Sequence, residues 1–103
     1  MANAIIGSTI VIDGEIIGDE DLVILGTVKG RIELRHDLFV SAGATVEAQV
    51  QAQNIEITGQ VTGNVSASDK VDLKPDCRMV GDIKAPRILI SDGASFKGNV
   101  DMD

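Results

Sequence analysis

A short frame of apolar residues recurs along the chain and limits the fold more than any other feature. In the segment 55–65, with the sequence IEITGQVTGNV, apolar residues alternate with other residues on both sides of a tight corner. Alternation with a period of two indicates β-strands, because successive side chains leave opposite faces of a strand. Strands this short cannot bury one face alone, so they must stack on copies of themselves.

Copies of this frame fill most of the chain. They start near residues 10, 22, 38, 55, 71 and 88, so successive starts lie 12, 16, 17, 16 and 17 residues apart. A period near 17 predicts a solenoid, in which each repeat contacts only its neighbours. No long stretch has the i, i+3, i+4 apolar pattern of a helix. We therefore predict one all-β domain, a parallel β-solenoid of about six rungs at residues 8–100, with tails at 1–7 and 101–103.

One slot of the frame holds a small residue in every copy. If the strand is continuous there, the small residue makes room inside the core; if the strand bends, the residue supplies the bend. Both readings stay open. The slot is filled by Gly18, Gly30, Ala48, Gly63, Gly81 and Gly98.

Three copies have a longer corner, with the sequences SAGAT, KPDCR and SDGAS. Gly43, Asp76 and Gly93 share one slot of these corners, and glycine and aspartate tolerate a left-handed backbone. We therefore predict that backbone conformation in this slot. The next slot holds alanine or Cys77, so Cys77 is expected to be a small structural residue and not a reactive thiol.

Charge and composition exclude several classes of function. The net charge of −7 argues against a general surface for nucleic-acid backbone. The single cysteine excludes an internal disulfide and fits a reducing compartment. The chain has no signal peptide and no apolar run long enough to cross a bilayer. We therefore expect a cytoplasmic protein.

Residues that could support catalysis or bind a metal are few and scattered. His36 is the only histidine, and nothing near it suggests a partner base or nucleophile. The acidic run 19–21 is expected to be a solvated turn. Lys29, Arg31 and Arg35 gather in one rung, either as a solvated face or as a patch for an anionic lipid or acidic partner. The sequence predicts no catalytic, cofactor or metal site.

Several segments resemble the bactofilins, which are bacterial cytoskeletal proteins. They are DLVILGTVKGRI at 21–32, the V-x-G-x-V/I elements through Val100, and GASFKG at 93–98. The resemblance covers about residues 8–100. It implies a right-handed triangular β-helix that polymerises end to end without a nucleotide. It also implies filaments in the cytoplasm, often at the inner face of the membrane, that scaffold cell-shape or envelope proteins.

The ends of such a solenoid expose an unpaired strand edge and a slice of the core. Solenoids that stay monomeric usually cover their ends with polar capping repeats, and this sequence has none. We therefore expect the chain's main partner to be itself, with the polymerisation interface at the two ends. The expected residues are Ile10, Ile12 and Ile16 in the first rung, and Ile88, Ile90, Phe96 and Val100 in the last.

Two alternatives remain at this stage. Apolar residues spaced by six from Ile10 to Val46 fit the left-handed hexapeptide repeat of acyltransferases, although the spacing slips at Ile55 and Ile88. A monomeric solenoid that binds a partner along one face is the other alternative.

Overall fold

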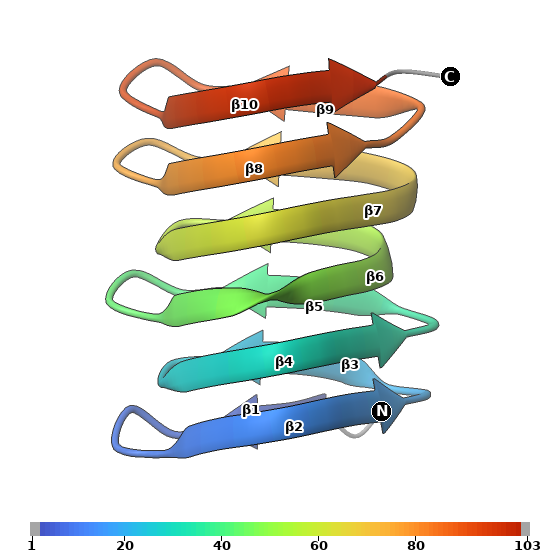
Figure 1. Ribbon diagram of the computed structural model, residues 1–103, viewed down its shortest axis with the longest axis vertical. Helices are drawn as coiled ribbons and strands as arrows, with labels where there is room; N and C mark the ends of the chain where they lie inside the picture. Colours follow the sequence, from blue (N-terminus) through green and yellow to red (C-terminus); the bar gives the residue numbers. More distant parts are fainter. Residues whose placement is uncertain (1–2, 102–103) are drawn as a thin grey trace.

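The computed structural model describes residues 3–101 as a stack of six rungs built from parallel strands (Figure 1). In Figure 1 the chain climbs from the N-terminus while its front strands run to the right and its rear strands run to the left, so the coil is right-handed. The strands are β1 (Asn3–Ile6), β2 (Val11–Gly18), β3 (Asp21–Ile24), β4 (Thr27–Leu34), β5 (Asp37–Val40), β6 (Thr45–Ile57), β7 (Gln60–Leu73), β8 (Arg78–Lys84), β9 (Arg87–Ile90) and β10 (Ser95–Asp101).

Each rung consists of a short strand, a corner and a longer, bent strand. The short strands stack as one column, β1, β3, β5, the end of β6, the end of β7, and β9. The longer strands stack as a second column, β2, β4, the start of β6, the start of β7, β8 and β10. The strands β6 and β7 each pass from one rung into the next, which is why they have 13 and 14 residues.

The first rung differs from the sequence prediction. Residues 3–6 were expected in a tail, but they form β1, and Ala4 and Ile6 pair with Leu22 and Ile24. Ile12 pairs instead with Val28. The first rung is therefore complete, and its frame starts earlier than the sequence suggested. At the other end, Asp101 belongs to β10 and not to a tail. The rest of the predicted tails, residues 1, 2, 102 and 103, lies outside the described residues.

The small-residue slot is a bend in the backbone. Gly30, Gly63, Gly81 and Gly98 have φ values between 119° and 142°. A Cβ atom on Gly81 would lie 2.0 Å from the carbonyl oxygen of Gly63 in the rung below, so the bend at Gly81 leaves no room for a side chain. Ala48, in the same slot, does not have a positive φ. The sequence misassigned the first member: Gly14 pairs with Gly30, whereas Gly18 pairs with Leu34.

The longer corners have the predicted left-handed residue. The φ angles of Gly43, Asp76 and Gly93 are 86°, 70° and 90°. Cys77 follows this residue in its corner and is 1% exposed, in agreement with a structural role. A fourth longer corner, at residues 7–10, was missed; there the backbone N–H of Ile10 donates to the carbonyl of Gly7 at 3.1 Å.

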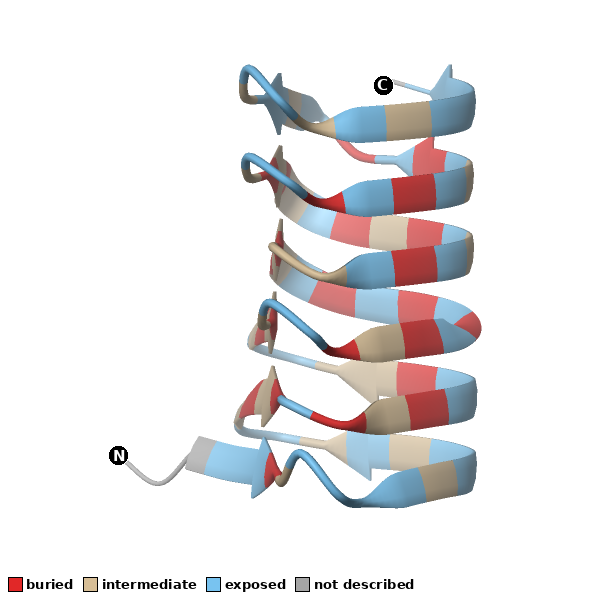
Figure 2. Cartoon of the chain, turned by 90° about the vertical axis from the view of Figure 1, so that its left-hand side faces the viewer, coloured by how far each residue is buried: buried red, intermediate tan, exposed pale blue. Residues whose placement is uncertain are grey.

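The core is a narrow aliphatic column along the stack. Ile24, Ile57 and Leu73 are fully buried in successive parts of it. Within residues 3–101, no polar or charged residue is buried as a whole. Figure 2 shows that burial is concentrated in the middle rungs and falls off at both ends.

Candidate functional site

The last rung exposes side chains that are covered everywhere else in the stack. Ile90 pairs with Leu73 in the rung below, yet Ile90 is 54% exposed and Leu73 is fully buried. Val100 is 43% exposed, whereas its counterpart Ile83 is buried. Phe96 is half-buried against the core. These apolar side chains point inward like their counterparts, and they are exposed because no rung lies above them.

The first rung has the same character at the opposite end. Ile12 and Ile16 are half-buried, and their counterparts Val28 and Ile32 are fully buried. Ile10, which was also predicted at this end, lies in a corner and is 45% exposed. The structure therefore places the predicted residues in the first and last rungs, at opposite ends of the stack, where Figure 2 shows that burial falls off.

Sequence reasoning missed a second apolar feature of the first rung. Ile5, Val11 and Ile17 point outward, one on each side of the coil, and are among the most exposed large apolar residues described. Their counterparts in later rungs include Thr27 and Glu33. The alternation of outward and inward apolar residues around Ile5 and Ile6 was the available signal, and the misplaced frame of the first rung concealed it.

The backbone at the two ends has unused hydrogen-bonding groups. In the first rung β1 pairs only with β3 and β2 only with β4, and in the last rung β9 pairs only with β7 and β10 only with β8. Each end therefore presents the edges of two strands, whose outer N–H and C=O groups have no neighbouring strand. Such an edge is a template for pairing with another chain. Over residues 3–101, no helix or loop covers either edge.

The predicted basic patch is divided and partly neutralised. Lys29 and Arg31 lie on either side of the bend at Gly30. The Nζ atom of Lys29 is 3.9 Å from Glu47, and Arg31 is 2.9 Å from Glu33. Arg35 is exposed beyond the end of β4. A patch for an anionic partner therefore stays a prediction.

Neither His36 nor Cys77 has the surroundings of a reactive group. The exposed His36 has its Nε2 atom 3.9 Å from a carboxylate oxygen of Asp19, one rung below. The pKa of the Cys77 thiol is raised above 9.0, chiefly because burial disfavours the thiolate. The described residues contain no cluster of His, Cys, Asp or Glu suited to a metal ion.

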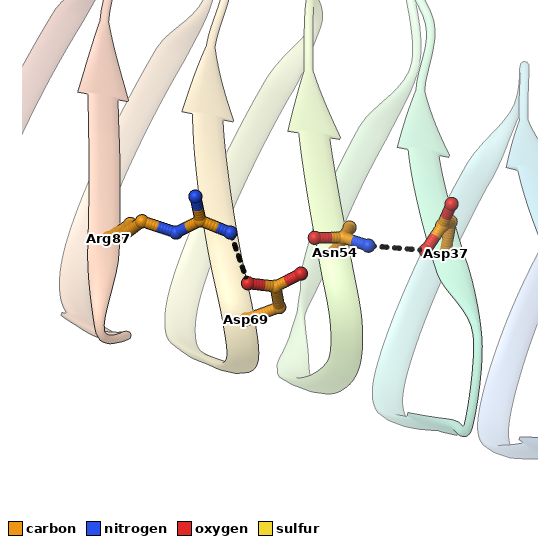
Figure 3. A network of polar contacts seen from close by, with 4 residues as sticks. All are labelled: Asp37, Asn54, Asp69 and Arg87. Carbon is orange, nitrogen blue, oxygen red and sulfur yellow. Dashed lines mark hydrogen bonds and ion pairs between the residues drawn. The ribbon is translucent and has the colours of Figure 1, made fainter.

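A polar column runs along the outer face of the short strands. Its members are the first residues of successive short strands. Figure 3 shows three of them, Asp37, Asn54 and Arg87, with the neighbouring Asp69. The amide of Asn54 donates to Asp37 at 2.9 Å, and Arg87 forms an ion pair with Asp69. On the same face Lys74 is 3.1 Å from Asp72, and this hydrogen bond and charge raise the pKa of Lys74 above 10.5.

No helix in residues 3–101 is long and apolar enough to cross a membrane.

Known proteins are similar to this chain over nearly all of its length. The family model for bactofilin, described as polymer-forming cytoskeletal, matches residues 4–101. Bactofilin BacO of Myxococcus xanthus is 72% identical over 103 residues, which cover 100% of this chain and 82% of BacO. Bactofilin BacP of the same organism is 46% identical over 100 residues, 97% of this chain and 42% of BacP. Bactofilin BacN is 43% identical over 99 residues, 96% of this chain and 88% of BacN.

A solved structure shares the fold as well. It is a cryo-EM reconstruction of Thermus thermophilus bactofilin double helical filaments, with a TM-score of 0.92 and 27% sequence identity. The likeness covers 97% of this chain and 99% of that one. The family model, the 72% sequence identity to BacO and the shared solenoid fold together show that the chain belongs to the bactofilin family of polymer-forming cytoskeletal proteins.

Proposed function

We propose that this chain assembles end to end into filaments, without a nucleotide, through the apolar rungs at its two ends. The observation that carries the proposal is the exposure of core positions there: Ile90 is 54% exposed, although its counterpart one rung below is fully buried. A second copy stacked on this end would cover Ile90 as the stack covers Leu73. The Thermus relative forms double helical filaments, which supports assembly of this chain into a filament.

Within the last rung, Phe96 is the strongest candidate for a contact across the junction. It stacks on Met79 and occupies the column that Ile12 begins at the other end of the molecule. Every other member of this column is aliphatic or methionine, so the largest side chain lies in the terminal layer. A large apolar group there can reach a facing end.

Replacing Phe96 by arginine tests the proposal. The substitution would place a charge in each junction, and an unpaired buried charge costs several kcal/mol. We expect filaments to give way to monomers or dimers in negative-stain images and in sedimentation velocity, while the circular dichroism of the β-sheet is retained. Dimers would indicate that the N-terminal ends still pair like to like.

The control is Ser95→Arg, which adds the same charge at an exposed position of the same strand and should leave filaments intact. Filaments of normal length from Phe96→Arg would refute its role in the junction. If Phe96→Arg fails to fold, the residue fills the core of its own molecule. Ile90→Arg, at a more exposed position, then tests the end contact independently.

The finer cellular role is also a proposal. The likeness to bactofilins supports a cytoplasmic filament that scaffolds cell-shape or envelope proteins, in places at the inner membrane face. Lys29, Arg31 and Arg35 are the residues proposed to contact an anionic membrane surface or an acidic partner. Because two of these three pair with glutamates, Arg35 would make the strongest contribution.

A further inference from the structure

The polar column has an unusual order of charges. Above Asn3 in the first rung, it consists of Asp21, Asp37, Asn54, Lys70 and Arg87, which stack on one another in successive rungs. Read along the stack, the charges are negative, negative, neutral, positive and positive. The order of the charges is antisymmetric: each charged residue on one side of Asn54 has a counterpart of opposite charge at the same distance on the other side.

This order is unfavourable within a single chain. Residues in neighbouring strands are about 4.8 Å apart, and like charges placed side by side destabilise a sheet. An alternating order would remove that repulsion. Some compensation exists, because Asn54 donates to Asp37 and Arg87 pairs with Asp69. Over residues 3–101, however, neither Asp21 nor Lys70 has an ion-pair partner.

We propose that this face binds the same face of a second copy in antiparallel orientation. A half-turn about an axis along the strands through Asn54 would lay Arg87 of one copy on Asp21 of the other. It would also lay Lys70 on Asp37. The contact is therefore self-complementary, as a two-fold interface between identical chains requires.

Two further observations favour this register. The Oδ1 atom of Asn54 is shielded from solvent and has no hydrogen-bond partner. One amide hydrogen of Asn54 is used by Asp37, and a turn of this amide on contact would let its second hydrogen and its Oδ1 atom pair with the Asn54 facing it across the axis. In the adjacent outward column, Val23 would meet Leu89, which is 51% exposed.

The other outward groups of this face are partly compensated: Phe39 would meet Asp72, whose charge is offset by Lys74 at 3.1 Å. Glu56 lies close to the axis and would approach its own copy, but Lys74 is 3.8 Å from it and offsets the charge. A groove of about 260 Å³ follows the column and is lined in part by Asn54, Lys70 and Arg87, which gives room for side chains of a facing copy.

The inference rests on the proposed function only where it concerns filaments: it predicts that filaments formed by end contacts pair laterally through antiparallel subunits. Two variants test it. Asp21→Lys with Asp37→Lys makes the column entirely positive, and Lys70→Glu with Arg87→Glu makes it entirely negative. Each variant alone should lose paired filaments in negative-stain images and keep single ones.

An equimolar mixture of the two variants should recover pairing, and so should one chain that carries all four substitutions, because both restore opposite charges across the axis. Pairing by either double variant alone at the wild-type frequency would overturn the proposal, as would failure of both the mixture and the fourfold variant to recover it. Absence of all filaments, single or paired, from the wild-type protein would instead contradict end-to-end assembly.

Chemical cross-linking tests the same contact without relying on images of paired filaments. With Cys77→Ala as background, Asn54→Cys places a thiol near the two-fold axis. Facing sheets are about 10 Å apart, so a short bis-maleimide can join two such thiols. We expect cross-linked dimers from Asn54→Cys and several-fold fewer from Gln60→Cys, an exposed position outside this face. Equal yields from the two would contradict the proposed face.

Discussion

At the scale of single residues, the stacked bends decide where a side chain can be tolerated. The φ angle of Gly81 is 133°, and a Cβ atom there would lie 2.0 Å from the backbone of Gly63. Gly14 has a similar φ angle of 150° but no atom within 4 Å of its Cβ position, because no rung lies below it. The pair therefore separates backbone strain from steric overlap.

We expect Gly81→Ala to lower the free energy of unfolding by more than Gly14→Ala does. Overpacking typically costs about 1–3 kcal/mol, and this cost adds to the strain that both positions share. Urea unfolding of the two variants measures the difference. Equal losses would show that strain at the bend, and not contact with the rung below, makes glycine necessary.

Cys77 allows a prediction of pH dependence. Burial raises the pKa of its thiol above 9.0 in the folded chain, so the folded state holds this proton more tightly than the unfolded state does. The resulting stabilisation is fully present below pH 9 and is lost as the pH rises through the folded pKa. Wild type should therefore lose free energy of unfolding more steeply above pH 9 than Cys77→Ala. Parallel curves would indicate that the thiol ionises normally.

At the scale of elements, the left-handed corners are the most direct test of how a rung is built. Gly43 has a φ angle of 86° and no atom within 4 Å of its Cβ position, so a larger residue meets no steric obstacle. Gly43→Val should still destabilise the fold by more than about 1 kcal/mol, because β-branched residues resist positive φ.

Thermal unfolding of Gly43→Val measures this cost, and Gly93→Val should behave in the same way. Ala42→Val is the control, since Ala42 is exposed, adjoins Gly43 and does not have a positive φ. If Gly43→Val melts at the wild-type temperature, the corner must be able to adopt another conformation.

The corners also explain which elements the sequence could predict. Gly43, Asp76 and Gly93 indicate three longer corners in the sequence, because glycine and aspartate tolerate a positive φ angle. The corner at residues 7–10 has Thr9 in the equivalent place and gives no such signal. Without that signal, Ile10 and Ile12 were taken for the start of a rung. The strand β1, whose inward residues include only a small alanine and one isoleucine, was therefore taken for a tail.

At the scale of the whole molecule, the period of the apolar frame predicted the architecture well. Six layers at about 4.8 Å give roughly 29 Å, and the longest dimension of the molecule is 28 Å. The fold is a right-handed parallel solenoid in a family of cytoskeletal proteins, so the interpretation as a hexapeptide-repeat acyltransferase was wrong and the chain is not an enzyme.

The surfaces were harder to predict than the stack. The apolar ends follow from the repeat alone, since any uncapped solenoid exposes its terminal core positions. The polar column does not, because its members lie 16 or 17 residues apart and only the strand register brings them together. The sequence likewise gathered Lys29 and Arg31 into one patch, which the bend at Gly30 divides.

The uneven burial of the rungs bears on how the protein is degraded. Segments with few buried contacts open locally at a lower free-energy cost than the core does, so the terminal strands of a free subunit are the first to become accessible to a protease. In a filament joined by its ends, each terminal rung gains a neighbour and that opening is suppressed. Proteolysis would then remove unassembled subunits and spare assembled ones, which couples the lifetime of each copy to its place in the polymer.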